Sequence, residues 1–186
     1  DPGDQYTITG MGYGLEGTVQ HAHGTSASID DAILPFILAG DAKLVDGKVV
    51  GDPTEGALLV LGAKAGLDVP VTIARYPRLA TLPFDPTYKF MATFHDVRTE
   101  TGQRVVRCFI KGAAPAVLER AAQALKQGEL IAWDEDLKTR ANENVVRMEG
   151  AGLRVMAAAQ KDLDPADFDA SGDLLKYVQD VAMTSI

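Results

Sequence analysis

The sequence is poor in cysteine, in basic residues and in long apolar runs, and each shortage excludes a class of protein. Its 186 residues include one cysteine, Cys108, so no internal disulfide can form. With 18 Lys and Arg against 26 Asp and Glu, the net charge of −8 argues against nucleic acid or an anionic membrane surface as the partner. No apolar run approaches the roughly 18 residues that a membrane-spanning helix requires.

Motifs that commonly bind nucleotides or metals are also missing or incomplete. No phosphate-loop pattern, Gly-x-x-x-x-Gly-Lys-Ser/Thr, occurs in the chain. Residues 12–17 match the dinucleotide pattern Gly-x-Gly-x-x-Gly, but residues 18–24 have no helical pattern that could receive a pyrophosphate. We therefore interpret these glycines as turn formers. His21 and His23 have no further ligand cluster, so we predict no metal site, and no Ser, Cys and His arrangement predicts nucleophilic catalysis.

The remaining composition is that of one globular domain. Apolar residues make up 46% and charged residues 24% of a chain long enough to build a core. Cys108 lies in an apolar strand pattern and is predicted to be a buried, inert thiol. We predict a single domain over residues 1–186. Because residues 182–186 are apolar and end without a polar tail, we expect this domain to be cut from a longer protein.

Turn and cap signals divide the chain into a sheet with helices around it. Strands are predicted at 6–9, 17–20, 79–84, 89–97, 103–111 and 153–159, with a hairpin at 43–50. Helices are predicted from Ser28 to about Asp41, from Asp52 to near Gly66, from Pro115 to before Gly128, and from Asp134 to near Gly150. Short turns between consecutive strands imply antiparallel pairing. We predict the α/β or α+β class, with an antiparallel twisted sheet flanked by helices.

The first informative motif is Asp52-Pro53-Thr54-Glu55. An Asp before Pro, with Glu three residues after it, is typical of a helix cap, and from the residues alone this interpretation is favoured. A glutamate in the first helical turn can also point one carboxylate oxygen outward, where it accepts a hydrogen bond from an adenine amino group. Both uses are compatible with one helix start.

The second motif places Phe84 between Pro83 and Asp85-Pro86, where a strand ends. Such an aromatic is either at the edge of the core or a face on which a purine stacks. Stacking is worth roughly 1–3 kcal/mol per base in nucleic-acid complexes. Flanking prolines would hold the ring in place and so lower the entropy cost of binding.

The third motif is Lys111-Gly112-Ala113 at the end of a predicted strand. A strand-end lysine is usually solvated, but two minimal side chains after it let a ligand approach the backbone closely. An amine next to such a gap suits a nucleotide. Lys89 and Met91 are predicted to share one side of the preceding strand.

Two further residues have open interpretations. Arg154, at the start of an apolar run, either pairs with a carboxylate on the sheet or reaches a pocket, where its guanidinium can bind phosphate oxygens in a fork. His95 alternates with Phe94 and Asp96 on a strand and is predicted to be half exposed.

In this order and at these separations, the motifs resemble the nucleotide-binding domain of P-type cation pumps. The resemblance covers nearly the whole chain and is specific at residues 52–55 and 111–113. The Lys-Gly-Ala segment resembles the type II-like branch that pumps calcium, sodium, potassium or protons. The histidine-proline signature of the transition-metal branch is missing.

The resemblance implies that the chain binds ATP. Phe84 would stack on the adenine with Glu55 near its amino group, Lys111 would line the adenine end, and Arg154 would approach the phosphates. The residues that the resemblance assigns to the site are Glu55, Phe84, Lys89, Met91, Lys111, Gly112, Ala113 and Arg154.

The resemblance also implies a cytoplasmic domain of a membrane pump, whose partners are the phosphorylation and actuator domains of the same polypeptide. The Asp-Lys-Thr-Gly-Thr phosphorylation motif is absent from this chain. We therefore expect a monomer that binds ATP, with Mg²⁺ on the phosphates in the intact pump, but does not hydrolyse it. Two positions depart from the family: Ala114 intervenes before Pro115, and Pro86 stands where some relatives carry a phosphate-binding arginine.

Two other functions fit the sequence less well. One is a regulatory or protein-interaction domain that keeps the fold but has lost ATP. The other is a small hydrolase, for which Asp134-Glu135-Asp136 has the required Asp-x-Asp spacing, although this segment is predicted to be a helix cap.

Overall fold

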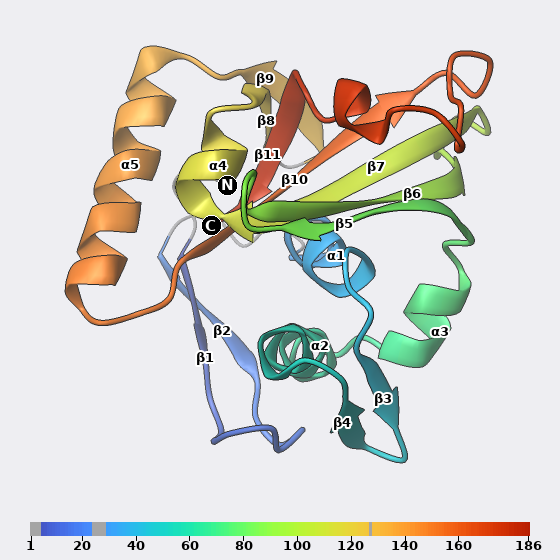
Figure 1. Ribbon diagram of the computed structural model, residues 1–186. Coiled ribbons are helices and arrows are strands. Elements are labelled where there is room, and N and C mark those ends of the chain that lie inside the picture. Colours follow the sequence, from blue (N-terminus) through green and yellow to red (C-terminus); the bar gives the residue numbers. More distant parts are fainter. Residues whose placement is uncertain (1–4, 24–28, 127) are drawn as a thin grey trace.

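A seven-stranded sheet forms the centre of the computed structural model, which describes residues 5–23, 29–126 and 128–186. Its strands are β5 (Arg78–Asp85), β6 (Phe90–Arg98), β7 (Arg104–Ala113), β8 (Ala121–Lys126), β9 (Glu129–Ala132), β10 (Met156–Leu163) and β11 (Val181–Ser185). They lie in the order β5-β6-β7-β10-β11-β8-β9, and every neighbouring pair is antiparallel except β11 with β8 (Figure 1). The predicted fold class is confirmed, with this parallel pair as an addition.

The helices divide between the two faces of the sheet (Figure 1). One face is covered by α1 (Asp30–Leu38), with α2 (Pro53–Lys64) and α3 (Val69–Ala74) beyond it. Two hairpins flank α2, namely β1 (Gln5–Ile8) with β2 (Val19–His23), and β3 (Lys43–Val45) with β4 (Lys48–Val50). The opposite face is covered by α4 (Ala114–Leu118), α5 (Glu135–Gly150) and the short 3₁₀ helix η1 (Leu174–Tyr177). Among the described residues, none of the helices is long and apolar enough to cross a membrane.

Local signals set several element ends where the sequence predicts them. Asp46 and Gly47 have φ values of 49° and 73°, as the type I′ turn between β3 and β4 requires. Asp52 accepts hydrogen bonds from two amides of the first turn of α2, and Asp134 accepts one from the first turn of α5, so both are confirmed as caps. The loop over residues 9–18 joins β1 to β2 and contains three glycines at positive φ, which confirms the turn interpretation.

The prediction of one helix from Pro115 to Gly128 is wrong. The helix α4 ends at Leu118, and residues 121–126 form β8, which pairs with β9 and with the distant β11. The alanine-rich segment favours a helix locally, but burial of Ala124 in the core and pairing on both sides of the strand override that preference. The helix α3 was not predicted, and Ser28 lies outside the described residues, with α1 beginning at Asp30.

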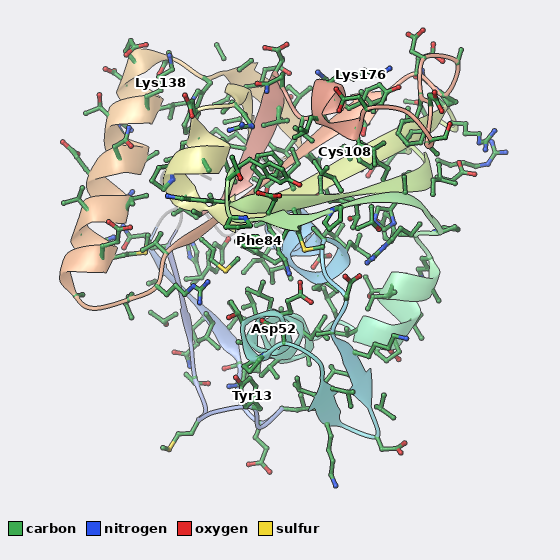
Figure 2. The ribbon with its side chains drawn as sticks, viewed as in Figure 1. Tyr13, Asp52, Phe84, Cys108, Lys138 and Lys176 are labelled. Carbon is green, nitrogen blue, oxygen red and sulfur yellow. The ribbon has the colours of Figure 1, made fainter. Side chains whose placement is uncertain are left out.

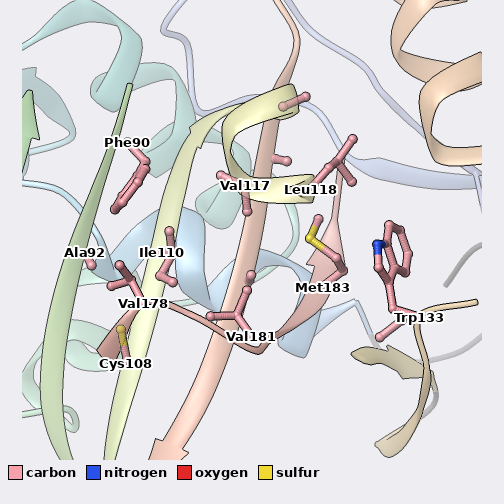
Figure 3. Close-up of a cluster of buried hydrophobic side chains, with 14 of the residues drawn as sticks. Phe90, Ala92, Cys108, Ile110, Val117, Leu118, Trp133, Val178, Val181 and Met183 are labelled. Carbon is pink, nitrogen blue, oxygen red and sulfur yellow. The ribbon is translucent and has the colours of Figure 1, made fainter. Parts of the chain in front are cut away.

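The larger hydrophobic core lies between the sheet and the α4, α5 and η1 side (Figure 3). It includes Phe90 and Phe94 of β6 and Cys108 and Ile110 of β7, each with 0% exposure. Burial raises the pKa of the Cys108 thiol well above its usual range, so the thiolate does not form at neutral pH. The prediction of a buried, inert thiol is confirmed.

Candidate functional site

Three of the predicted site residues lie in one row across the sheet. Met91 on β6 pairs directly with Lys111 on β7, so their side chains point to the same face. Beside them β5 carries a bulge, which leaves Pro83 and Phe84 together opposite Met91. Phe84 is 58% exposed, and Figure 2 shows it at the edge of the sheet in the direction of α2. We call Phe84, Met91 and Lys111 the site row.

Lys111 is buried and forms an ion pair with Glu55 from the first turn of α2. Its Nζ lies 3.0 Å from Oε1 of Glu55, and the two side chains are 4% and 18% exposed. Burial lowers the pKa of Lys111, and the hydrogen bond to Glu55 opposes this shift. Gly40 leaves room for the pair, because a Cβ at that position would lie 2.9 Å from the Lys111 Nζ. The ion pair therefore joins α2 to the site row.

The second carboxylate oxygen of Glu55 is held by the loop between α1 and β3. The amides of Asp41 and Ala42 donate to Oε2 at 2.8 and 2.9 Å. The loop was not recognised in the sequence, since nothing local connects residues 40–42 with Glu55. Because each carboxylate oxygen accepts about two hydrogen bonds, Oε1 can accept a second donor beside Lys111.

Gly112 is required by the sheet itself. A Cβ on Gly112 would overlap the carbonyl oxygen of Lys89 and the backbone of Phe90, its partner across the strands. The next amide, of Ala113, donates to the same Lys89 carbonyl at 2.9 Å. The space expected for a ligand at Gly112 is therefore filled by the protein's own backbone, and the small side chain permits close strand packing.

Lys89 and Arg154 lie at the same end of the sheet as the site row but outside the strands. Lys89 is exposed with φ at +59° and precedes β6, so the prediction that it shares one side of that strand with Met91 is wrong. Arg154 is exposed in the turn before β10, whose first residue, Met156, pairs with Ala113. The strand predicted from residue 153 thus begins three residues later.

His95 is buried with 2% exposure, so the prediction of a half-exposed residue is wrong. Its Nδ1 donates to the carbonyl of Tyr76 at 2.9 Å, and its Nε2 lies 2.9 Å from the hydroxyl of Thr93. The side of β6 that carries Thr93 and His95 is covered by α1 and by Tyr76 and Phe109, which the alternation of residues could not reveal. Burial lowers the pKa of His95 to about 4.

The donor and acceptor set of the site suits a purine base that carries an amino group. Phe84 provides an exposed aromatic face, and Glu55 provides a hydrogen-bond acceptor. Lys111 provides an amine that has further hydrogens besides the one it donates to Glu55. No group of three or more His, Cys, Asp or Glu side chains in residues 5–23, 29–126 and 128–186 is positioned to hold a metal ion.

Comparison with known proteins identifies the family of the chain. Residues 35–183 match the family described as the cytoplasmic domain N of P-type ATPases. The chain is 33% identical over 178 residues to the cation-transporting ATPase pma1 of Synechocystis, an alignment that covers 88% of this chain and 19% of that protein. It is 31% identical over 158 residues to calcium-transporting ATPase type 2C member 1 of Mus musculus, covering 82% of this chain and 17% of that protein.

A third relative, the probable cation-transporting ATPase F of Mycobacterium bovis, is 35% identical over 137 residues, which cover 71% of this chain and 14% of the relative. The chain thus spans about a fifth or less of the length of these relatives. The chain belongs to the family of P-type ATPase cytoplasmic N domains, as the resemblance of its motifs predicted.

Proposed function

We propose that this chain is the nucleotide-binding domain of an ATP-driven cation pump and that it grips ATP by the adenine. The observation that carries the proposal is the site row, in which an exposed aromatic ring stands beside a buried ion pair. Phe84 would stack on the purine, while Oε1 of Glu55 would accept from the adenine amino group. Lys111 would hold that carboxylate in place and donate a remaining hydrogen to the base.

This chain would make fewer contacts with the phosphates than with the base. Arg154 would approach them as a guanidinium fork, and Lys89 and Met91 would complete the walls of the site. Because the net charge is −8, the overall field does not attract ATP and local cations must do so. We expect a dissociation constant of roughly 0.1–10 mM, or about −3 to −5 kcal/mol.

In the intact pump, hinge closure would carry the bound ATP to an aspartate on a phosphorylation domain, on the cytoplasmic side of the membrane. Mg²⁺ on the phosphates would neutralise charge during transfer to that aspartate. The residues of this chain would bind and orient the nucleotide without cleaving it. The actuator domain would be a further partner within the same polypeptide.

The experiment that tests this proposal is a titration of ATP and of AMP followed by amide NMR shifts. We expect the shifts to cluster at Glu55, Phe84, Lys111 and Arg154 and to be similar for the two nucleotides, since both carry adenine. Phe84→Ala should weaken binding about tenfold, the loss expected for one stacked base. Leu130→Ala is the matched control, because Leu130 is exposed to a similar extent, 56%, on β9 at the opposite edge of the sheet.

Absence of shifts in wild type at about 10 mM ATP, the upper end of the expected range of dissociation constants, would overturn the proposal. The better account would then be a regulatory or interaction domain with the same fold. Equal losses in Phe84→Ala and Leu130→Ala would show that the base does not stack on Phe84.

A further inference from the structure

The loop between α1 and β3 is held from two sides by groups of opposite charge. On its carbonyl side, the guanidinium of Arg78 at the start of β5 donates to the carbonyls of Leu38 and Gly40 and to the carboxylate of Asp41. The distances to Leu38 and to Asp41 are 2.9 and 2.7 Å. Arg78 therefore satisfies carbonyl groups at the end of α1 that have no partner within the helix.

On its amide side, the same loop binds Glu55. One of the two amides that hold Oε2, that of Asp41, belongs to the same peptide unit as the Gly40 carbonyl held by Arg78, and the amide of Ala42 follows one residue later. A peptide unit fixed at its carbonyl has its amide direction fixed as well, because the unit is planar. The orientation of the Glu55 carboxylate thus depends on the guanidinium of Arg78, although Glu55 belongs to a different element.

We propose that Arg78 is a positioning residue for the adenine site. By fixing the loop over residues 38–42, it keeps Oε2 of Glu55 occupied by two amides and so directs Oε1 toward Lys111 and the ligand. A planar fork with several donors suits this task, whereas a lysine amine cannot reach three oxygens in the same geometry. This inference rests on the proposed binding of adenine at Glu55 and Lys111.

The test is a double-mutant cycle on ATP affinity. Arg78→Ala should weaken ATP binding about fivefold to tenfold, the usual effect of losing a charge-assisted hydrogen bond that organises a site. In a Glu55→Ala background, the same substitution should change affinity less than about twofold, because the oxygen that the loop amides hold, and through which Arg78 acts, is already gone. Arg78→Lys should restore only part of the affinity.

A spectroscopic readout separates positioning from general stability. In the ligand-free protein, the side-chain carboxyl resonance of Glu55 and the Cε resonances of Lys111 should move in Arg78→Ala. The matched control is Arg104→Ala, which breaks a two-bond ion pair with Asp96 at the opposite end of β6 and β7. It should leave those resonances and the ATP affinity unchanged.

The outcomes distinguish this inference from the proposed function. If wild type does not bind ATP, the proposed function and this inference both fail. If wild type binds ATP but the effects of Arg78→Ala and Glu55→Ala are additive, only the positioning role is overturned. Unchanged Glu55 and Lys111 resonances in folded Arg78→Ala would also overturn the positioning role.

Discussion

The residues of β6 alternate between two faces of the sheet, and the two faces bury side chains of different polarity. Toward α4 and η1 the strand presents only apolar side chains in its buried part, whereas toward α1 it presents Met91, Thr93 and His95. The neighbouring strand β7 repeats the pattern and adds Lys111 on the α1 side. The apolar face needs no partners beyond close packing, while each polar group on the α1 face has to be paired.

This difference indicates which face carries stability and which carries the site. Packing on the α4 face consists of ring and aliphatic contacts, such as those of Phe94 with Phe168 and Tyr177. On the α1 face, the paired groups include Lys111 with Glu55, His95 with Thr93, and Arg78 with the loop after α1. We expect substitutions on the first face to reduce stability, and those on the second to change binding or pH dependence as well.

The largest effect should come from the apolar face. Phe94→Ala removes a ring with 0% exposure, and we expect it to lower the free energy of unfolding by about 3–5 kcal/mol. Urea unfolding followed by fluorescence or circular dichroism measures this change. A loss below about 1 kcal/mol would show that the core on this face relaxes far more than close packing allows.

The pH dependence of stability should come from the α1 face. His95 has its pKa lowered to about 4 from 6.5, mainly by burial and further by the nearby Arg78, so it is neutral when folded. The contribution of neutral His95 to the free energy of unfolding is complete above pH 6.5. It is lost as the pH falls from 6.5 toward 4, because in this range the unfolded chain takes up the proton and the folded chain does not. The loss amounts to about 3 kcal/mol.

The corresponding measurement is urea unfolding of wild type and of His95→Gln between pH 7.5 and pH 4, two values that bracket the ordinary histidine pKa of about 6.5. Glutamine can donate to the Tyr76 carbonyl and accept from Thr93, but it does not titrate. The difference between the two proteins should therefore shrink as the pH falls.

An intermediate effect is expected at the ion pair. Lys111→Met keeps the aliphatic stem but leaves Oε1 of Glu55 without its amine, while two amides still hold Oε2. We expect a loss of about 2 kcal/mol in unfolding free energy, because one buried charged group loses a partner. ATP binding should weaken in the same variant. A stability loss with unchanged ATP affinity would assign the pair to structure alone.

The smallest effect on stability should come from Phe84→Ala. Although it removes the same ring as Phe94→Ala, the side chain is 58% exposed, so we expect the unfolding free energy to change by no more than about 0.5 kcal/mol. The two substitutions thus compare a ring buried in the core with a ring exposed at the surface. Similar stability losses in both would show that Phe84 belongs to the core.

Much of the fold could be predicted because its signals are local. The turn at Asp46 and Gly47, the caps at Asp52 and Asp134, and the strands β5 to β7 depend on residues close together in sequence. The strand β8 could not be predicted, since its pairing with β11 joins distant segments and its alanines favour a helix locally. The same limit applies to His95, whose burial depends on helices and loops from elsewhere in the chain.

The candidate site residues could be named one by one from the sequence, but the contacts among them could not. Phe84 and Met91 lie beside Lys111 as the strand order implies, yet the ion pair of Lys111 with Glu55 spans 56 positions of sequence. Such a contact leaves no periodic signal. The loop that fixes Glu55 through its amides was missed for a similar reason, because backbone donors are present at nearly every residue.

The bulge on β5 also bears on solubility. β5 is an edge strand of the sheet, and an exposed ring on an edge favours pairing with another chain and aggregation. At this point the strand carries Pro83, which has no amide hydrogen, and the extra bulged residue breaks the regular spacing of donors and acceptors. The strand can therefore leave Phe84 open without offering a continuous edge on which a second molecule could add a strand.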